Sequence, residues 1–145
     1  MARSKTYKKN IFCLESLWDH NLQNRLTVLP ILDLIAKRHG VKFIHLTCNT
    51  AEEFVHNLRL LPRRNGYAIL YLAFHGKAGR LVLERESISL EDLAEILNKR
   101  LSNWIVHFGC CGTLSAKEFR IRDFTSRTEA LMVTGTIHDS RNKIV

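Results

Sequence analysis

The sequence predicts an α/β domain in which helices cover both faces of a mostly parallel β-sheet. Five short apolar runs typical of buried strands alternate with amphipathic segments that begin at capping residues. Because the links between them are short, successive strands should run in the same direction through right-handed crossovers. We expect a single domain over residues 1–145, with the five strands in the sheet order 2-1-3-4-5.

The first strand-to-helix unit lies near the N-terminus. Residues 10–14 (NIFCL) form an apolar run suited to a buried strand, and the polar residues 18–24 follow as a loop. Thr27 can then cap a helix in which Pro30 occupies the first turn, where its missing N–H is no loss. Gly40 supplies the end of that helix.

The second unit repeats this pattern. Residues 41–46 are the second predicted strand, and Thr50–Glu53 is a capping box. The helix it opens presents Phe54, Leu58 and Leu61 at helical spacing.

The second half of the chain continues the alternation. Residues 67–74 (YAILYLAF) are apolar on both faces, as expected for a central strand, 104–108 (WIVHF) are the fourth strand, and 130–134 are the fifth. The intervening segments are a small hairpin over residues 80–88, a helix capped by Ser89 and an amphipathic segment with Phe119 and Phe124, and a polar tail follows at 138–143.

The composition is that of an ordinary globular protein, with 46% hydrophobic and 25% charged residues. The longest apolar run, residues 67–74, is far shorter than the roughly 20 residues that a membrane-crossing helix needs. Four cysteines, two of them adjacent, are too few for a disulfide scaffold and fit a reducing compartment. We therefore expect a soluble, cytoplasmic protein without membrane contact.

The chain is strongly basic, with a formal charge of +8, and would attract polyanions at low salt. Its Lys and Arg residues are scattered, however, without the interleaved aromatic residues of a single-strand binding platform. A solvated basic surface is the favoured interpretation, and we expect any nucleic-acid binding to be weak.

Two pairs of chemically competent residues come directly after neighbouring predicted strands. His75-Gly76 follows the third strand, and Cys110-Cys111 follows the fourth after Gly109. The carboxyl ends of parallel strands, about 4.8 Å apart, share one edge of a sheet where ligands and catalytic groups gather. An imidazole can take a proton from a thiol there, and the Gly76 N–H can contribute to an oxyanion hole.

A structural interpretation of the same residues competes with the catalytic one. Free cysteines are commonly small buried hydrophobes, and a histidine at a strand end is commonly satisfied by its neighbours. Spacing alone favours this structural interpretation for His75, Cys110 and Cys111.

Several blocks of the sequence together resemble one family of enzymes. The blocks are YLAFHGKAGRLVL (71–83), ISLEDLAEIL (88–97) and WIVHFGCCGTLS (104–115), and the opening NIFCLESLWD (10–19) fits as well. They resemble the CHAT branch of the caspase-like clan of cysteine peptidases, especially its small stand-alone bacterial members. The resemblance covers approximately residues 9 to 135 and implies a caspase-like three-layer fold.

The resemblance also implies roles for individual residues. The His-Gly match makes His75 the general base and Gly76 a backbone oxyanion donor, and the Cys-x-Thr pattern fits Cys111-Gly112-Thr113, which selects Cys111 as the nucleophile. Cys110 takes the place of a small residue, and as a vicinal thiol it can replace its neighbour or trap it as a disulfide. The implied function is a cofactor-independent cysteine endopeptidase that cleaves a protein partner in a bacterial defence or signalling system.

The end of the chain departs from the family pattern. After Gly135 the family continues through a further strand and helix, whereas residues 136–145 are short, polar and basic. The C-terminal part of the domain is therefore expected to be incomplete. The alternative function is a catalytically inactive caspase-like module that binds a protein or a nucleic acid.

Other candidate sites have weaker support. His107, Cys110 and Cys111 are potential metal ligands, but adjacent cysteines match structural zinc spacing poorly, and no Gly-rich loop indicates a nucleotide, so we expect neither a metal nor a cofactor. His107 alternates with Val106 on its strand and fits a core histidine better. Glu15, Asp19 and His20 follow the first strand, where a carboxylate can select a basic substrate side chain, although a polar loop is the favoured interpretation.

Overall fold

A computed structural model describes residues 9–17, 26–62, 66–110, 112–136 and 142–144. The main sheet has the strand order β2-β1-β3-β7-β8-β9, and a second sheet has the order β4-β5-β6. The strands are β1 (Asn10–Glu15), β2 (Phe43–Thr47), β3 (Tyr67–Ala73), β4 (His75–Lys77), β5 (Arg80–Val82), β6 (Ser87–Ser89), β7 (Ile105–Phe108), β8 (Met132–Thr136) and β9 (Asn142–Ile144). The helices are α1 (Leu29–His39), α2 (Ala51–Arg59), α3 (Leu90–Ile96) and α4 (Glu118–Thr128), with a 3-10 turn η1 (Thr113–Ser115).

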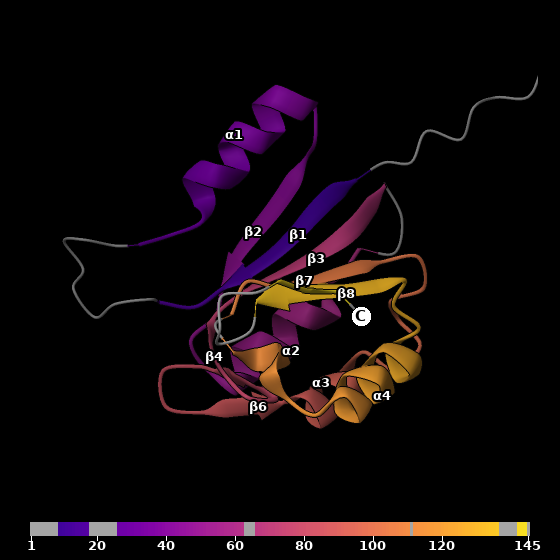
Figure 1. Cartoon of the computed structure of the whole chain (residues 1–145). Helices are drawn as coiled ribbons and strands as arrows, with labels where there is room; N and C mark the ends of the chain where they lie inside the picture. The colour runs from indigo at the N-terminus through magenta and orange to yellow at the C-terminus, as the bar shows by residue number, and fades with distance from the viewer. Residues whose placement is uncertain (1–8, 18–25, 63–65, 111, 137–141, 145) are drawn as a thin grey trace, which may run out of the picture.

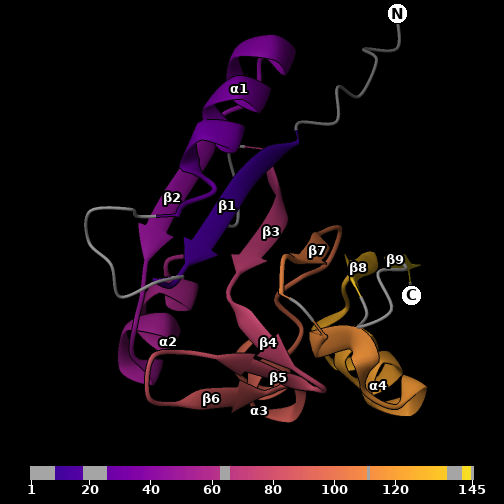
Figure 2. The ribbon, with the colours of Figure 1, turned by 60° about the vertical axis from the view of Figure 1, so that its left-hand side comes forward.

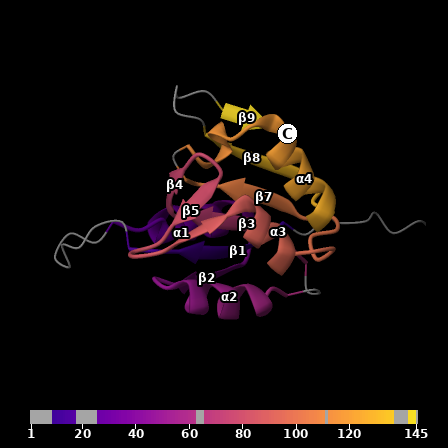
Figure 3. The ribbon, with the colours of Figure 1, turned by 90° about the horizontal axis from the view of Figure 1, so that it is seen from below.

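The five predicted strands correspond to β1, β2, β3, β7 and β8, and their predicted order is confirmed. All four neighbouring pairs among these strands are parallel, and Figure 3 shows the order across the sheet from β2 to β9. Strands β2 and β8 start two residues later than predicted. The fold is therefore α/β with a mostly parallel main sheet.

Helices lie on both faces of the main sheet. In Figure 1, α1 lies above the sheet, and α2, α3 and α4 lie below it. Two separate hydrophobic clusters match this arrangement: the larger fills the space beneath the sheet, and the smaller joins α1 to β1 through Leu32, Ile11 and Cys13. None of the helices in the described ranges is long and apolar enough to cross a membrane.

Three of the predicted helix signals act as expected. The Thr50 hydroxyl oxygen accepts a 3.1 Å hydrogen bond from the Glu53 N–H, and the Ser89 hydroxyl oxygen accepts one of 3.0 Å from the Asp92 N–H. Gly40 ends α1 with a φ of +62°, a conformation that favours glycine. These local signals explain why the helices begin or end at these residues.

The structure differs from the expectations at several places. Val28, not Thr27, is the N-cap of α1, because the Thr27 side chain is directed to Glu15 and to the Leu29 N–H instead. Phe119 on α4 is 66% exposed, whereas Phe124 is buried in the core as its spacing suggests. The end of the predicted polar tail, residues 142 and 143, belongs to β9, which pairs antiparallel with β8.

Candidate active site

The ends of β3 and β7 lie side by side at the carboxyl edge of the main sheet. The two strands are parallel neighbours, with Leu72 opposite Phe108. Just beyond this pair, the Gly109 N–H donates a 2.9 Å hydrogen bond to the Leu72 carbonyl oxygen. The segment that carries His75 and the turn that carries Cys110 therefore leave the sheet from adjacent positions.

His75 lies at the start of a new strand and not in a loop after β3. Phe74 is fully buried after β3, and the exposed His75 then begins β4, the first strand of the second sheet (Figure 2). His75 is opposite Val82 and Gly76 is opposite Leu81 in the antiparallel pairing of β4 with β5. The candidate base is thus held on a three-stranded hairpin arrangement at the rim of the main sheet.

The thiol of Cys110 is part of the core. Cys110 is 1% exposed, and its Sγ donates a 3.1 Å hydrogen bond to the Leu72 carbonyl oxygen, which also receives the Gly109 N–H. Cys110 therefore attaches the turn to the end of β3. Cys111, the predicted nucleophile, lies outside the described residues.

The turn after β7 is attached to the His75 hairpin by two hydrogen bonds. The Thr113 hydroxyl donates to the Arg80 carbonyl oxygen at 3.0 Å, and the Gly79 N–H donates to the Thr113 carbonyl oxygen at 2.8 Å. Thr113 is fully buried, which limits the access of water to its side of these bonds, although Arg80 is exposed. Thr113, the third residue of the Cys-x-Thr pattern, thus fixes the hairpin to the turn. We call the two hydrogen bonds between Thr113 and residues 79 and 80 the hairpin clamp.

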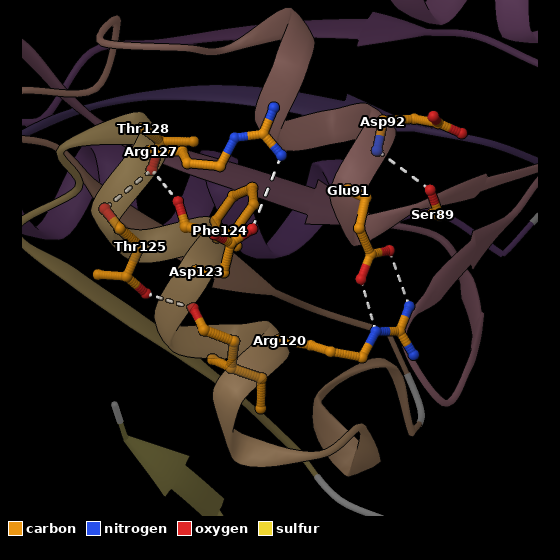
Figure 4. Close-up of polar contacts among 10 residues, drawn as sticks. Ser89, Glu91, Asp92, Arg120, Asp123, Phe124, Thr125, Arg127 and Thr128 are labelled. Carbon is orange, nitrogen blue, oxygen red and sulfur yellow. Dashed lines mark hydrogen bonds and ion pairs between the residues drawn. The ribbon is translucent and has the colours of Figure 1, made fainter.

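Arg120 on α4 supports the other side of the hairpin. Its Nε lies 2.6 Å and its Nη2 2.9 Å from the two carboxylate oxygens of Glu91 on α3 (Figure 4). Arg120 Nη2 also lies 3.4 Å from the Gly79 carbonyl oxygen, which accepts a 3.0 Å hydrogen bond from the Leu90 N–H. The hydrogen bonds from Arg120 lower the pKa of Glu91 to about 2. Both side chains are partly exposed.

Gly79 has no room for a side chain. A Cβ at this position would come within 2.4–2.6 Å of the Arg120 guanidinium, and its φ of +72° is unfavourable for other residues. Glycine therefore permits Arg120 to reach the hairpin turn.

Tyr71 lies against the start of the cysteine turn. Its Cε2 lies 2.5 Å and its hydroxyl oxygen 3.1 Å from the position that a Cβ on Gly109 would occupy. Burial raises the pKa of the Tyr71 hydroxyl, and the neighbouring Cys13, Glu15 and Cys110 groups raise it further. The phenol is therefore neutral at physiological pH and limits the space on the α1 side of the turn.

Glu15 lies at the carboxyl end of β1 on the same edge, but its carboxylate has partners within the protein. Oε1 accepts a 2.5 Å hydrogen bond from the Thr27 hydroxyl and lies 2.8 Å from His45 Nε2, and Oε2 accepts a 2.9 Å bond from the Val28 N–H. The side chain is 3% exposed. These contacts attach the start of α1 to the sheet, and Asp19 and His20 lie outside the described residues.

A pocket opens beside this carboxylate. It has a volume of about 230 Å³ and lies at the carboxyl ends of β1 and β2. Apolar and polar side chains share its lining: Glu15, Ser16, Leu17, Leu26, Thr27, Leu29, His45, Thr47 and Asn49. A basic substrate group entering here would compete with the three donors that already surround Glu15.

The potential metal ligands His107 and Cys110 are directed to different partners. The Nδ1 of His107 lies 2.7 Å from the Thr134 hydroxyl oxygen, and its ring stacks obliquely at 5.2 Å from that of Tyr71. Cys110 instead packs in the larger hydrophobic cluster. Burial lowers the pKa of His107, so this half-buried imidazole stays neutral at physiological pH. No three His, Cys, Asp or Glu side chains gather as a metal site among the described residues.

A family model matches residues 8–144, which is nearly the whole chain. The chain belongs to DUF6642, a family of unknown function. No curated protein matches the chain.

Sequence reasoning missed three contacts that shape the candidate site of this DUF6642 protein. They are the Arg120–Glu91 pair, the approach of Tyr71 to Gly109 and the bond from Thr113 to Arg80. Only the last had a local signal, because Thr113 belongs to the Cys-x-Thr pattern. The other two contacts join residues more than 25 positions apart, and no sequence motif connects the residues of either pair.

Proposed function

We propose that this DUF6642 protein is a cysteine endopeptidase with Cys111 as nucleophile and His75 as general base. The observation that carries the proposal is the hairpin clamp: hydrogen bonds of Thr113 with Gly79 and Arg80 hold the hairpin that begins at His75 against the segment that follows β7. The ends of β3 and β7, from which the two segments leave, are parallel neighbours. The resemblance to the CHAT branch assigns the same two residues.

The proposed reaction proceeds through a thioester. The His75 imidazole takes the proton of the Cys111 thiol, and the sulfur attacks the carbonyl carbon of the scissile peptide bond. The Gly76 N–H donates a hydrogen bond to the oxygen that becomes negatively charged. His75 then gives its proton to the leaving amine, and a water molecule, activated by the same imidazole, hydrolyses the thioester and restores the thiol.

In this proposal Cys110 has a structural role. Its thiol is buried and directed to the Leu72 carbonyl oxygen, so a substitution there should disturb packing more than chemistry. The substrate class is a protein or peptide. A place in a bacterial defence or signalling system follows from the family resemblance and is part of the same proposal.

The decisive experiment is alkylation with iodoacetamide from pH 5 to 8, followed by peptide mass spectrometry. Burial raises the pKa of Cys48 to about 12 and raises that of Cys13 as well, so the folded protein offers little competing reactivity at these thiols. We expect Cys111 to react fastest, with an apparent pKa below the ordinary thiol value of about 8.5.

The variants separate the proposed roles. His75→Ala should raise the apparent pKa of Cys111 toward the ordinary value, whereas His39→Ala, which removes an exposed histidine on α1, should leave it unchanged. A peptidyl fluoromethyl ketone should label the wild type and Cys110→Ala but not Cys111→Ala. If Cys111 of the wild type reacts as an unactivated thiol, no faster than Cys111 of His75→Ala, the inactive binding module becomes the better hypothesis.

A further inference from the structure

Helix α1 exposes apolar side chains on the side away from the sheet. Only Leu32 of this helix is buried, whereas Ile31 is 58% and Leu34 is 64% exposed. Leu26, just before the helix, is 68% exposed. A surface helix normally turns its apolar stripe to the core and presents polar residues to solvent.

The exposed residues form a continuous row at helical spacing. Pro30 and Ile31 are followed by Leu34 and then by Lys37 and Arg38, so each member lies three or four residues from the next on the helix surface. All five are exposed. We call this row the α1 outer stripe: its first half is apolar and its second half is basic.

None of the described elements covers the stripe. Figures 1 and 2 show α1 at the periphery of the molecule, with the sheet on its inner side only. An apolar surface rimmed by charge is a feature of interaction sites.

We propose that the α1 outer stripe is a docking surface for an acidic amphipathic helix of a protein partner. The partner would place apolar residues, spaced three and four apart, against Ile31 and Leu34, and Asp or Glu residues about one turn further along against Lys37 and Arg38. We choose an acidic partner because of the charge on the stripe, whose second half consists of the exposed basic residues Lys37 and Arg38.

The same observations disfavour two other occupants. A second copy of the chain would bring basic residues to the interface, because Asp33 is the only acidic residue in α1 and the chain carries +8. An anionic membrane surface would need a wide apolar face, often with aromatic residues, whereas the stripe is a single row without an aromatic residue and has Asp33 beside it. This inference does not depend on the proposed peptidase activity.

The test uses a fluorescent synthetic peptide with Leu at positions i, i+3, i+4 and i+7 and Glu at most of the others. One control peptide has the same composition in scrambled order, and a second replaces Glu by Lys. Fluorescence anisotropy with the whole protein should show saturable binding of the first peptide only. We expect Ile31→Ser/Leu34→Ser to weaken that binding by about tenfold or more.

A charge reversal and a matched control complete the design. Lys37→Glu/Arg38→Glu should transfer the preference from the Glu peptide to the Lys peptide. Leu131→Ser, which removes a side chain that is 67% exposed elsewhere, should change nothing. Thermal unfolding of each variant checks that it is folded.

Several outcomes would overturn the proposal. They are absence of binding by the Glu peptide, equal binding of the scrambled peptide, binding unaffected by the stripe variants, or binding of the wild type to phosphatidylserine vesicles in place of the peptide. Self-association of the wild type that is lost in Ile31→Ser/Leu34→Ser would assign the stripe to a second copy instead.

Discussion

The Sγ of Cys110 donates a 3.1 Å hydrogen bond to the carbonyl oxygen of Leu72, across the gap between two neighbouring strands of the main sheet. The first of two adjacent cysteines is therefore directed into the core, at the position where the turn after β7 begins. This contact distinguishes the expected behaviour of Cys110 from that of Cys111.

Substitution of Cys110 should affect stability. Cys110→Ala removes a buried sulfur and one hydrogen bond to Leu72, and we expect it to lower the free energy of unfolding by about 1–2 kcal/mol. Cys110→Ser keeps a donor and should be at least as stable as the alanine variant. Urea unfolding measures the stability of both variants. A serine variant that is less stable than the alanine variant would contradict a stabilising contribution of the hydrogen bond to Leu72.

The hairpin clamp should contribute to both stability and thiol reactivity. Thr113→Val has nearly the same shape but lacks the donor to the Arg80 carbonyl oxygen, and we expect it to cost about 1 kcal/mol. If the proposed function is right, it should also slow the alkylation of Cys111 by displacing His75. Thr125→Val is the matched control, because that hydroxyl donates within α4 to the Ile121 carbonyl oxygen. Equal effects of both variants on alkylation would contradict the role of the clamp.

The Glu91–Arg120 pair predicts a loss of stability in acid. The pKa of Glu91 is about 2 in the folded protein, below its ordinary value, so its contribution is complete above the ordinary value and is lost as pH falls toward 2. Because both side chains are partly exposed, we expect a contribution within ~1 kcal/mol that decreases with salt. The measurement is the melting temperature of wild type and Glu91→Gln between pH 2 and 7. A difference that does not narrow as the pH is lowered would contradict this assignment.

Gly109 should not tolerate a side chain while Tyr71 is present. Gly109→Ala places a Cβ 2.5 Å from Tyr71 Cε2, and we expect a destabilisation of about 1–3 kcal/mol. Combining it with Tyr71→Val should recover part of this loss, which a double-mutant cycle measures. Gly40→Ala is the control: its new Cβ has open space around it, and the cost comes from the positive φ of residue 40, so Tyr71→Val should not rescue this variant. Additive effects of Gly109→Ala and Tyr71→Val would disprove the contact.

Much of the fold could be predicted because its signals are local. The apolar run that became β1 is buried throughout, and those that became β3 and β7 have no exposed residue. The caps at Thr50 and Ser89 mark helix starts by their own side-chain hydrogen bonds. The strand order follows from short parallel crossovers, a constraint that needs no knowledge of individual side chains.

The remaining features depend on contacts between distant parts of the chain. Thr27 is a residue type that commonly caps helices, but its hydroxyl donates a hydrogen bond to Glu15, 12 residues earlier, and the helix starts after Val28 instead. Strand β9 is held by backbone pairing to β8. Polar residues can form such backbone hydrogen bonds, but they leave no apolar pattern from which the strand could be predicted. In the candidate site, the sequence predicts that His75 and the two cysteines follow strands at one sheet edge. The contact of Arg120 with Gly79, 41 residues earlier, could not be predicted, because it depends on how α4 packs against the hairpin.

The contacts that position the His75 hairpin can form only late in synthesis, because they come from residues further along the chain. Thr113 lies 33 residues after the carbonyl that it binds, and Arg120 lies 41 residues after Gly79. A chain that emerges from the ribosome with its N-terminal end first can therefore pair β1, β2 and β3 well before the hairpin has the residues that hold it. The hairpin that begins at His75 gains the last of these contacts only when α4 has been made, so a nascent chain would carry the first three strands of the sheet well before it carried a finished site.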